Sequence, residues 1–204
     1  MTTTTTSSTT ARINGGQDAQ QGRYPYTVSL QLVSDLLHFC GGTLVGTNIV
    51  LTAAHCLDAS ADELAVRIRP YHLKNPAAES SIFPVRRIAL HPEYDPDTLH
   101  HDVGMIELDT SLGGIDVADQ HSSTPIINRY DGIPIVGQSV LQMGWGDSSN
   151  GLGEYTDVLQ VVEGRTIADD VCAERVRGTR NEMVCTVEGQ NEGICYGDSG
   201  ETSQ

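Results

Sequence analysis

Short segments in which apolar and polar residues alternate run through most of the chain, and this pattern constrains the fold more than any other feature. Between Tyr26 and Leu32 the alternation has the period of two that is typical of a half-buried strand. Similar runs recur up to residue 167, and the chain's 21 glycines and 8 prolines suit the turns between them. Only residues 168–178 have helical character, with Asp169 or Asp170 as the N-cap. The sequence therefore predicts an antiparallel all-β barrel or sandwich.

The strands form two groups, before and after a loop around Asp119 to Asp131. A chain of 204 residues is long enough for one large β domain or two small ones. Its formal net charge of −15 argues against nucleic acid as a partner, because a phosphate backbone is bound by a basic surface. No apolar run approaches 18 residues, so no membrane span is expected.

Residues 1–12 are expected to be disordered, because a stretch rich in threonine and serine cannot bury apolar surface. The first ten residues contain neither the basic region nor the apolar region of a secretory signal peptide. The sequence leaves three interpretations of this stretch open: a linker, a remnant of a pro-segment, or an artefact of the start site.

The chain contains five cysteines, which is an odd number. In a reducing compartment all of them would be free thiols, whereas in an oxidising compartment two disulfides would leave one cysteine over. The five are Cys40, Cys56, Cys172, Cys185 and Cys195.

Three short motifs carry the side chains that nucleophilic catalysis by serine requires, namely a base, a group that orients the base, and the nucleophile. LTAAHC contains His55, HHDVGMIEL contains Asp102, and GDSG contains Ser199. Each motif alone also has a structural interpretation, since a histidine after an apolar strand is usually structural and an aspartate before a strand usually caps a turn. The three together, in this order, match the pattern of a known protein family.

These motifs resemble those of the trypsin/chymotrypsin family of serine endopeptidases. The segment ARINGGQDA is similar to the family's activation site, with Asn14 in place of the usual valine, and YPYTVSL, FCGGTLV and GWGD follow in family order. The resemblance extends from Arg12 to Gly200. It implies a protease domain at residues 13–204.

The resemblance implies two antiparallel β-barrels, at about residues 26–118 and 132–204, with a Ser-His-Asp triad in the cleft between them. His55 is the expected general base that takes the proton of Ser199, while Asp102 holds the other ring nitrogen. The backbone N–H groups of Gly197 and Ser199 are the expected oxyanion hole. The missing side chain of Gly197 leaves room for the approaching oxyanion.

The family's activation mechanism implies that the protein is made as a zymogen. Cleavage after Arg12 would free the amino group of Ile13, and this ammonium would pair with Asp198 and order the oxyanion loop. The physical reason is that a buried carboxylate without a partner is costly.

The resemblance also implies disulfides between Cys40 and Cys56, beside the catalytic histidine, and between Cys172 and Cys185. Cys195 matches a third family disulfide whose usual partner lies downstream of the serine. Only four residues follow the GDSG motif here. We therefore expect a truncated chain with an incomplete second barrel and Cys195 as a free thiol.

Specificity is expected to depend on residues just before the nucleophile. The floor of the family's specificity pocket is set six residues before the serine, which is Gly193 in this chain. Trypsin-like enzymes carry an aspartate there to pair with lysine or arginine. With Ile194 beside Gly193 and Tyr196 near the pocket mouth, the sequence predicts a preference for apolar P1 residues.

No cofactor and no metal are expected. His100 and His101 adjoin Asp102, but adjacent residues of a strand point to opposite faces, so surface histidines are expected rather than ligands. Calcium is not expected, because Glu79 stands nearly alone in the segment where some family members bind that ion.

The leading hypothesis is a secreted, monomeric serine endopeptidase that acts on proteins or peptides and is activated by another protease. A catalytically inactive homologue that binds or inhibits another protein is the alternative, and such homologues usually lose a triad residue. A β-barrel adhesion module is the third possibility, and it would leave the triad unexplained. All three triad residues stand in the sequence, which favours the enzyme.

Overall fold

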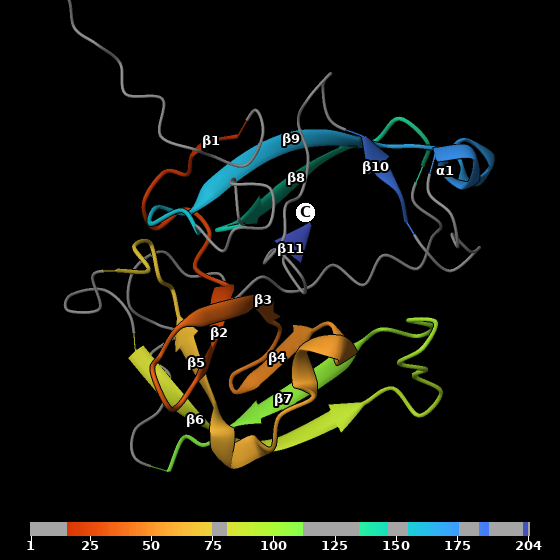
Figure 1. Ribbon diagram of the computed structural model, residues 1–204. Coiled ribbons are helices and arrows are strands. Elements are labelled where there is room, and N and C mark those ends of the chain that lie inside the picture. Colours follow the sequence, from red (N-terminus) through yellow and green to blue (C-terminus); the bar gives the residue numbers. More distant parts are fainter. Residues whose placement is uncertain are drawn as a thin grey trace, which may run out of the picture.

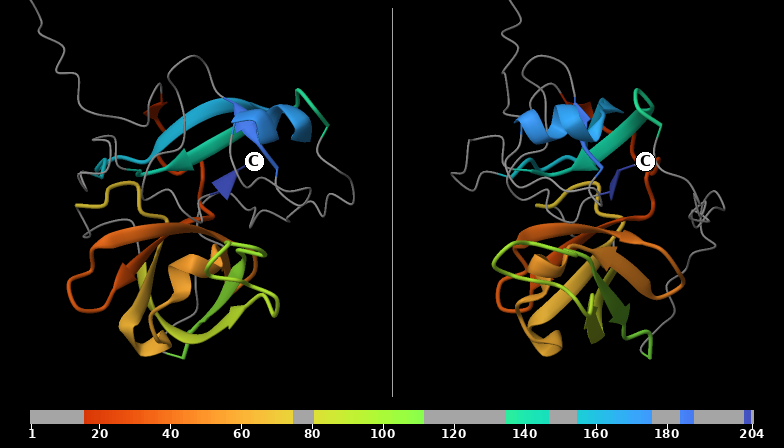
Figure 2. Two further views of the ribbon diagram at one scale, coloured as in Figure 1. Left: turned by 45° about the vertical axis from the view of Figure 1, so that its right-hand side comes forward. Right: turned by 90° about the vertical axis from the view of Figure 1, so that its right-hand side faces the viewer.

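The computed structural model describes residues 16–74, 81–111, 135–146, 155–175, 184–187 and 202–203. These residues form two β units, a closed barrel and an open sheet (Figure 1). Figure 2 shows the same two units stacked on one another in two further views. No helix within these residues is long and apolar enough to cross a membrane.

The first unit is a closed antiparallel barrel with the strand order β2-β3-β4-β7-β6-β5. Closure leaves no unpaired strand edge. Two 3₁₀ turns, η1 (Ala54–Leu57) and η2 (Ala61–Glu63), lie between β4 and β5. Apolar side chains that are fully buried fill the barrel: Val28, Leu30, Val50, Val66 and Ile106. The six strands are β2 (Thr27–Leu32), β3 (His38–Leu44), β4 (Ile49–Thr52), β5 (Leu64–Ile68), β6 (Ser81–Leu90) and β7 (Gly104–Leu108).

The second unit is a five-stranded antiparallel sheet, which is open within the described residues. Its centre is the pair β8 and β9, and β11 lies on the other side of β8. Both β1 and β10 pair with β9. The predicted barrel architecture is therefore present in the first unit, whereas the second is described only as a sheet. Its strands are β1 (Gln17–Asp18), β8 (Ser139–Gly144), β9 (Gln160–Thr166), β10 (Thr186–Val187) and β11 (Thr202–Ser203).

One short helix, α1 (Asp169–Arg175), follows β9, close to the position that the sequence predicted. The helix begins at Asp169, so both aspartates lie in its first turn instead of capping it. The N–H of Val171 donates to Oδ1 of Asp170 at 2.8 Å. The disulfide between Cys172 and Cys185 ties α1 to the segment before β10.

The prediction of a half-buried strand at 26–32 is wrong, because the polar side of β2 is buried as well. Ser29 is 0% exposed and Gln31 is 2% exposed. The reason is the contact between the two units. Oγ of Ser29 lies 2.9 Å from Nδ1 of His38 on β3, and the rings of Trp145 and Tyr155 pack edge-on against His38 with centroids 5.5 and 5.2 Å away.

A second contact between the units centres on Asp157. Its carboxylate accepts a hydrogen bond from the backbone N–H of Lys74 at 2.6 Å and lies 3.0 Å from Nδ1 of His72. Backbone bonds run alongside, from Leu73 N–H to the carbonyl of Asp157 and from Leu159 N–H to the carbonyl of Tyr71. Burial alone would raise the pKa of Asp157, but the hydrogen bonds from Lys74 and His72 outweigh it and lower the pKa.

Replacing Asp157 with asparagine is expected to destabilise the fold most at pH values well above 4. A folded-state pKa below the unfolded value of about 4 stabilises the fold above that pH, and the stabilisation is lost as pH falls through the folded pKa. The free energy of unfolding should therefore be lower in Asp157→Asn than in wild type, and this difference should be largest at pH 6 and shrink below pH 4. Urea unfolding at pH 6, 4 and 3 measures it, with Glu174→Gln on the exposed face of α1 as control. A difference that stays constant across this pH range would contradict the claim that the charge of Asp157 stabilises the fold.

Candidate active site

The turn η1 holds His55 at the surface of the barrel. The chain leaves β4 through Ala53, which is extended with φ −75° and ψ 145°, and then turns. Ala54 and Leu57 are 0% and 5% exposed and anchor the turn in the core. His55 lies between them in sequence, and its side chain remains 34% exposed. The turn therefore presents the imidazole on a backbone that is fixed by core packing.

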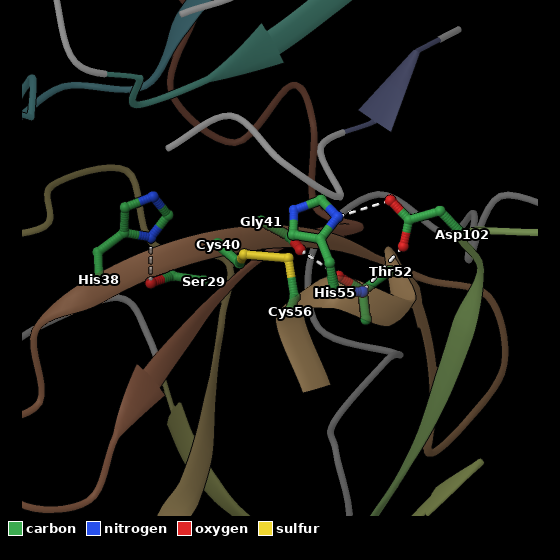
Figure 3. Close-up of a disulfide and its surroundings, with 8 residues drawn as sticks. All are labelled: Ser29, His38, Cys40, Gly41, Thr52, His55, Cys56 and Asp102. Atoms are coloured by element: carbon green, nitrogen blue, oxygen red, sulfur yellow. Dashed lines mark hydrogen bonds and ion pairs between the residues drawn. A yellow bond between two sulfur atoms is a disulfide. The ribbon is translucent and has the colours of Figure 1, made fainter. Parts of the chain in front are cut away.

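A disulfide fastens the same turn to β3 (Figure 3). Cys40 and Cys56 are joined with an S–S distance of 2.06 Å and are separated by 16 residues, as the family resemblance implied. A loop of this length gives about 3 kcal/mol of stabilisation when loop-closure entropy dominates. Next to it, Oγ1 of Thr52 donates to the carbonyl of Gly41 at 2.7 Å, which fixes β3 against the end of β4.

Asp102 approaches His55 from the hairpin between β6 and β7. Just before it, His101 has a left-handed backbone with φ 51°, and the N–H of Val103 donates to the His101 carbonyl at 2.7 Å. Two residues further on, Gly104 allows close contact with η1. A Cβ at Gly104 would lie 2.5 Å from Cδ1 of Leu57, so a larger residue would force the Leu57 side chain to shift.

The Asp102 carboxylate binds His55 through both of its oxygens (Figure 3). Oδ2 lies 2.6 Å from Nδ1 of the ring, and Oδ1 accepts from the backbone N–H of His55 at 2.8 Å. Because a carboxylate accepts, Nδ1 carries the proton and the lone pair is on Nε2. The imidazole is thereby fixed in the tautomer and orientation of a general base.

Several residues of the predicted site lie outside the described residues. They are the triad and oxyanion residues Ser199 and Gly197, the activation residues Arg12, Ile13 and Asp198, the pocket residues Gly193, Ile194 and Tyr196, and the fifth cysteine, Cys195. The described chain resumes three residues after Ser199, where Thr202 pairs with Met143 on β8. Strand β11 also contacts β3, the strand that carries Cys40.

Two groups of described side chains come close enough to hold a metal ion. The first consists of Cys40, His55 and Cys56, but its two sulfurs are joined in a disulfide and provide no thiolate. The second is formed by His91, Glu93 and His101 on the β6–β7 hairpin. No metal was expected from the sequence, in which the members of the second group lie up to ten residues apart.

The chain is similar to known proteins over nearly its whole length. Residues 13–202 match the family model described as Trypsin. A dog protein named Serine protease 1 is 30% identical over 192 residues, which are 93% of this chain and 73% of that protein. Trypsin alpha of Drosophila melanogaster is 30% identical over 93% of this chain and 71% of its own length.

A solved structure agrees with these matches. The human heparin binding protein superposes with a TM-score of 0.79 at 25% identity, and the match covers 94% of this chain and 80% of that one. The closed barrel, the His55–Asp102 pair and these similarities lead to the same assignment: the chain belongs to the trypsin family of serine proteases.

Proposed function

We propose that the protein is a serine endopeptidase that hydrolyses peptide bonds through an acyl-enzyme. The observation that carries the proposal is the contact between Asp102 and His55, which presents Nε2 as a proton acceptor. Ser199 Oγ attacks the substrate carbonyl carbon and transfers its proton to Nε2. The imidazolium, stabilised by Asp102, then protonates the leaving amine as the C–N bond breaks. Water hydrolyses the resulting ester and regenerates the serine.

The return of the chain at β11 supports Ser199 as the nucleophile. Thr202 lies three residues beyond Ser199 and belongs to a strand that contacts β3. The disulfide between Cys40 on β3 and Cys56 places η1, and with it His55, beside β3. The strand that follows the GDSG motif thus contacts the strand to which the turn carrying the proposed base is disulfide-bonded.

Activation by proteolysis is part of the proposal. Cleavage after Arg12 gives Ile13 a free ammonium group, and this group pairs with Asp198 next to the nucleophile. The pairing orders the backbone N–H groups of Gly197 and Ser199, which then stabilise the oxyanion. Two disulfides among the described residues suit an oxidising compartment, so we propose that the protein acts outside the cell.

A binding module without catalysis is the second candidate, because one structural match is named for binding heparin. Heparin is a polyanion, and the net charge of −15 on this chain opposes its binding. A binding role would thus require a different partner, such as another protein. The intact contact between His55 and Asp102 favours the endopeptidase.

Digestion of a peptide library that varies the P1 residue tests the function and its specificity together. Gly193 supplies no carboxylate to the pocket floor, and burying a cation without a counter-charge costs several kcal/mol. Since about 1.4 kcal/mol corresponds to a tenfold change in rate, cleavage after apolar residues should exceed cleavage after lysine or arginine by about 100-fold or more.

The protein is first cut after Arg12 by an immobilised activating protease, which is then removed. The Ser199→Ala variant, treated in the same way, reports any residual activity of the activator. Absence of cleavage by the activated wild type would contradict the endopeptidase. Dominant cleavage after lysine or arginine would contradict the assignment of Gly193 to the pocket floor, but it would still support the endopeptidase activity.

A further inference from the structure

Two histidines and a glutamate lie together on the β6–β7 hairpin, on residues that the proposed reaction does not use. One potential ligand atom from each of His91, Glu93 and His101 lies within 4.8 Å of the other two. The two imidazole rings stack with centroids 4.7 Å apart and an interplanar angle of 14°. Oε2 of Glu93 lies 4.0 Å from Nε2 of His101. This hairpin is drawn in yellow-green beyond β6 and β7 in Figure 1.

The backbone holds the two histidines opposite each other at the base of the hairpin. The N–H of His91 donates to the carbonyl of Val103 at 3.0 Å, and the N–H of Val103 donates to the carbonyl of His101 at 2.7 Å. The left-handed backbone at His101, with φ 51°, interrupts the regular strand. The same bend therefore directs the His101 ring toward His91 and the following residue, Asp102, toward His55.

The ligand types match a zinc-class ion. Imidazole nitrogen and carboxylate oxygen bind zinc with bonds of about 2.0–2.2 Å, so two ligand atoms of a tetrahedral site lie about 3.3–3.6 Å apart. The ligand atoms, which lie within 4.8 Å of one another, need to come closer by at most about 1.5 Å. Glu93 can move toward the rings, because its side chain is 76% exposed. The two stacked imidazoles must also tilt, so that their in-plane lone pairs converge on the ion. Calcium and magnesium prefer oxygen ligands alone, which makes two imidazoles unsuitable for them.

One existing hydrogen bond competes with the metal. The backbone N–H of Glu93 donates to Nδ1 of His91 at 3.2 Å. A neutral imidazole has only one nitrogen lone pair, which can either accept this hydrogen bond or bind the metal ion. This hydrogen bond is at the long end of the normal range, so giving it up lowers the affinity for the metal ion without removing the site. The excess of negative charge on the chain favours binding of a cation.

We propose that His91, Glu93 and His101 bind a zinc-class divalent transition-metal ion, with water as the fourth ligand. The ion connects the two arms of the hairpin that carries Asp102 and stabilises its bent backbone. The inference does not depend on the proposed function, because none of the three residues belongs to the triad.

Calorimetric titration of the metal-free protein with zinc chloride tests the site. Wild type is expected to bind one equivalent at this site, and His91→Asn and His101→Asn should each weaken binding at least tenfold. Asparagine tolerates the left-handed backbone at position 101, so this variant should keep the hairpin conformation. Zinc should also raise the Tm of wild type and not that of His101→Asn.

Two matched controls separate this site from its neighbours. His100→Asn removes the adjacent imidazole, and His55→Ala removes the imidazole of the proposed triad; zinc affinity should change less than twofold in both. Equal affinity in wild type and His101→Asn would overturn the proposal, as would a loss of binding only in His55→Ala.

If the variants do not fold, the spectrum of wild type with cobalt(II) decides, because a tetrahedral site gives intense visible bands and a surface-bound aqueous ion does not.

Discussion

Asp102→Asn is expected to lower kcat for peptide hydrolysis by about 10⁴-fold at neutral pH. The magnitude is the one established for this aspartate in Ser-His-Asp triads, and the structure supplies the reason. An asparagine amide can donate to Nδ1 of His55, which then loses its proton to Nε2. A protonated Nε2 cannot accept the proton of Ser199. KM should change little, because the lost interaction belongs to the transition state.

The fold of this variant should remain intact, since Asp102 is partly exposed and His55 is held by η1 and the Cys40–Cys56 disulfide. Asp157→Asn is the matched control, because it also replaces an aspartate that contacts a histidine, in this case His72. Its kcat at pH 7 should stay within about twofold of wild type. A decrease of less than tenfold in Asp102→Asn would show that the carboxylate does not orient the base.

Ser199→Ala is expected to lower kcat by about 10⁶-fold, and His55→Ala should have an effect of the same size. The two groups act as one unit, so losing either should cost about as much as losing both. The kcat of the double variant Ser199→Ala/His55→Ala should therefore lie within about tenfold of the kcat of either single variant. Effects that multiply would indicate that the two residues act in separate steps.

Local and covalent features of the site could be predicted from the sequence. The motif around His55 follows an apolar strand, and the structure forms η1 at this place. The contact between His55 and Asp102 came from the family resemblance, although 47 residues separate them. The pairing of Cys40 with Cys56 also came from the resemblance. The contact and the disulfide were predicted through the motifs that carry the resemblance, and not through spacing alone.

Features that depend on tertiary packing could not be predicted. The polar residues of β2 alternate like solvent-facing residues, yet Ser29 is covered because Trp145 of the second unit packs against its neighbour His38. Likewise, His101 was expected on a regular strand, whereas its left-handed backbone brings it to His91. Alternation reports the period of a strand, but it does not report which elements pack against its faces.

The central claim is that His55, oriented by Asp102, activates Ser199. A fluorophosphonate tests it most directly, because it forms a covalent bond with an activated serine Oγ. After cleavage following Arg12, wild type should be labelled on the peptide that contains Ser199, as read by mass spectrometry. Labelling should be lost in His55→Ala and slowed in Asp102→Asn. An adduct on another residue, or equal labelling of wild type and His55→Ala, would contradict the proposed triad.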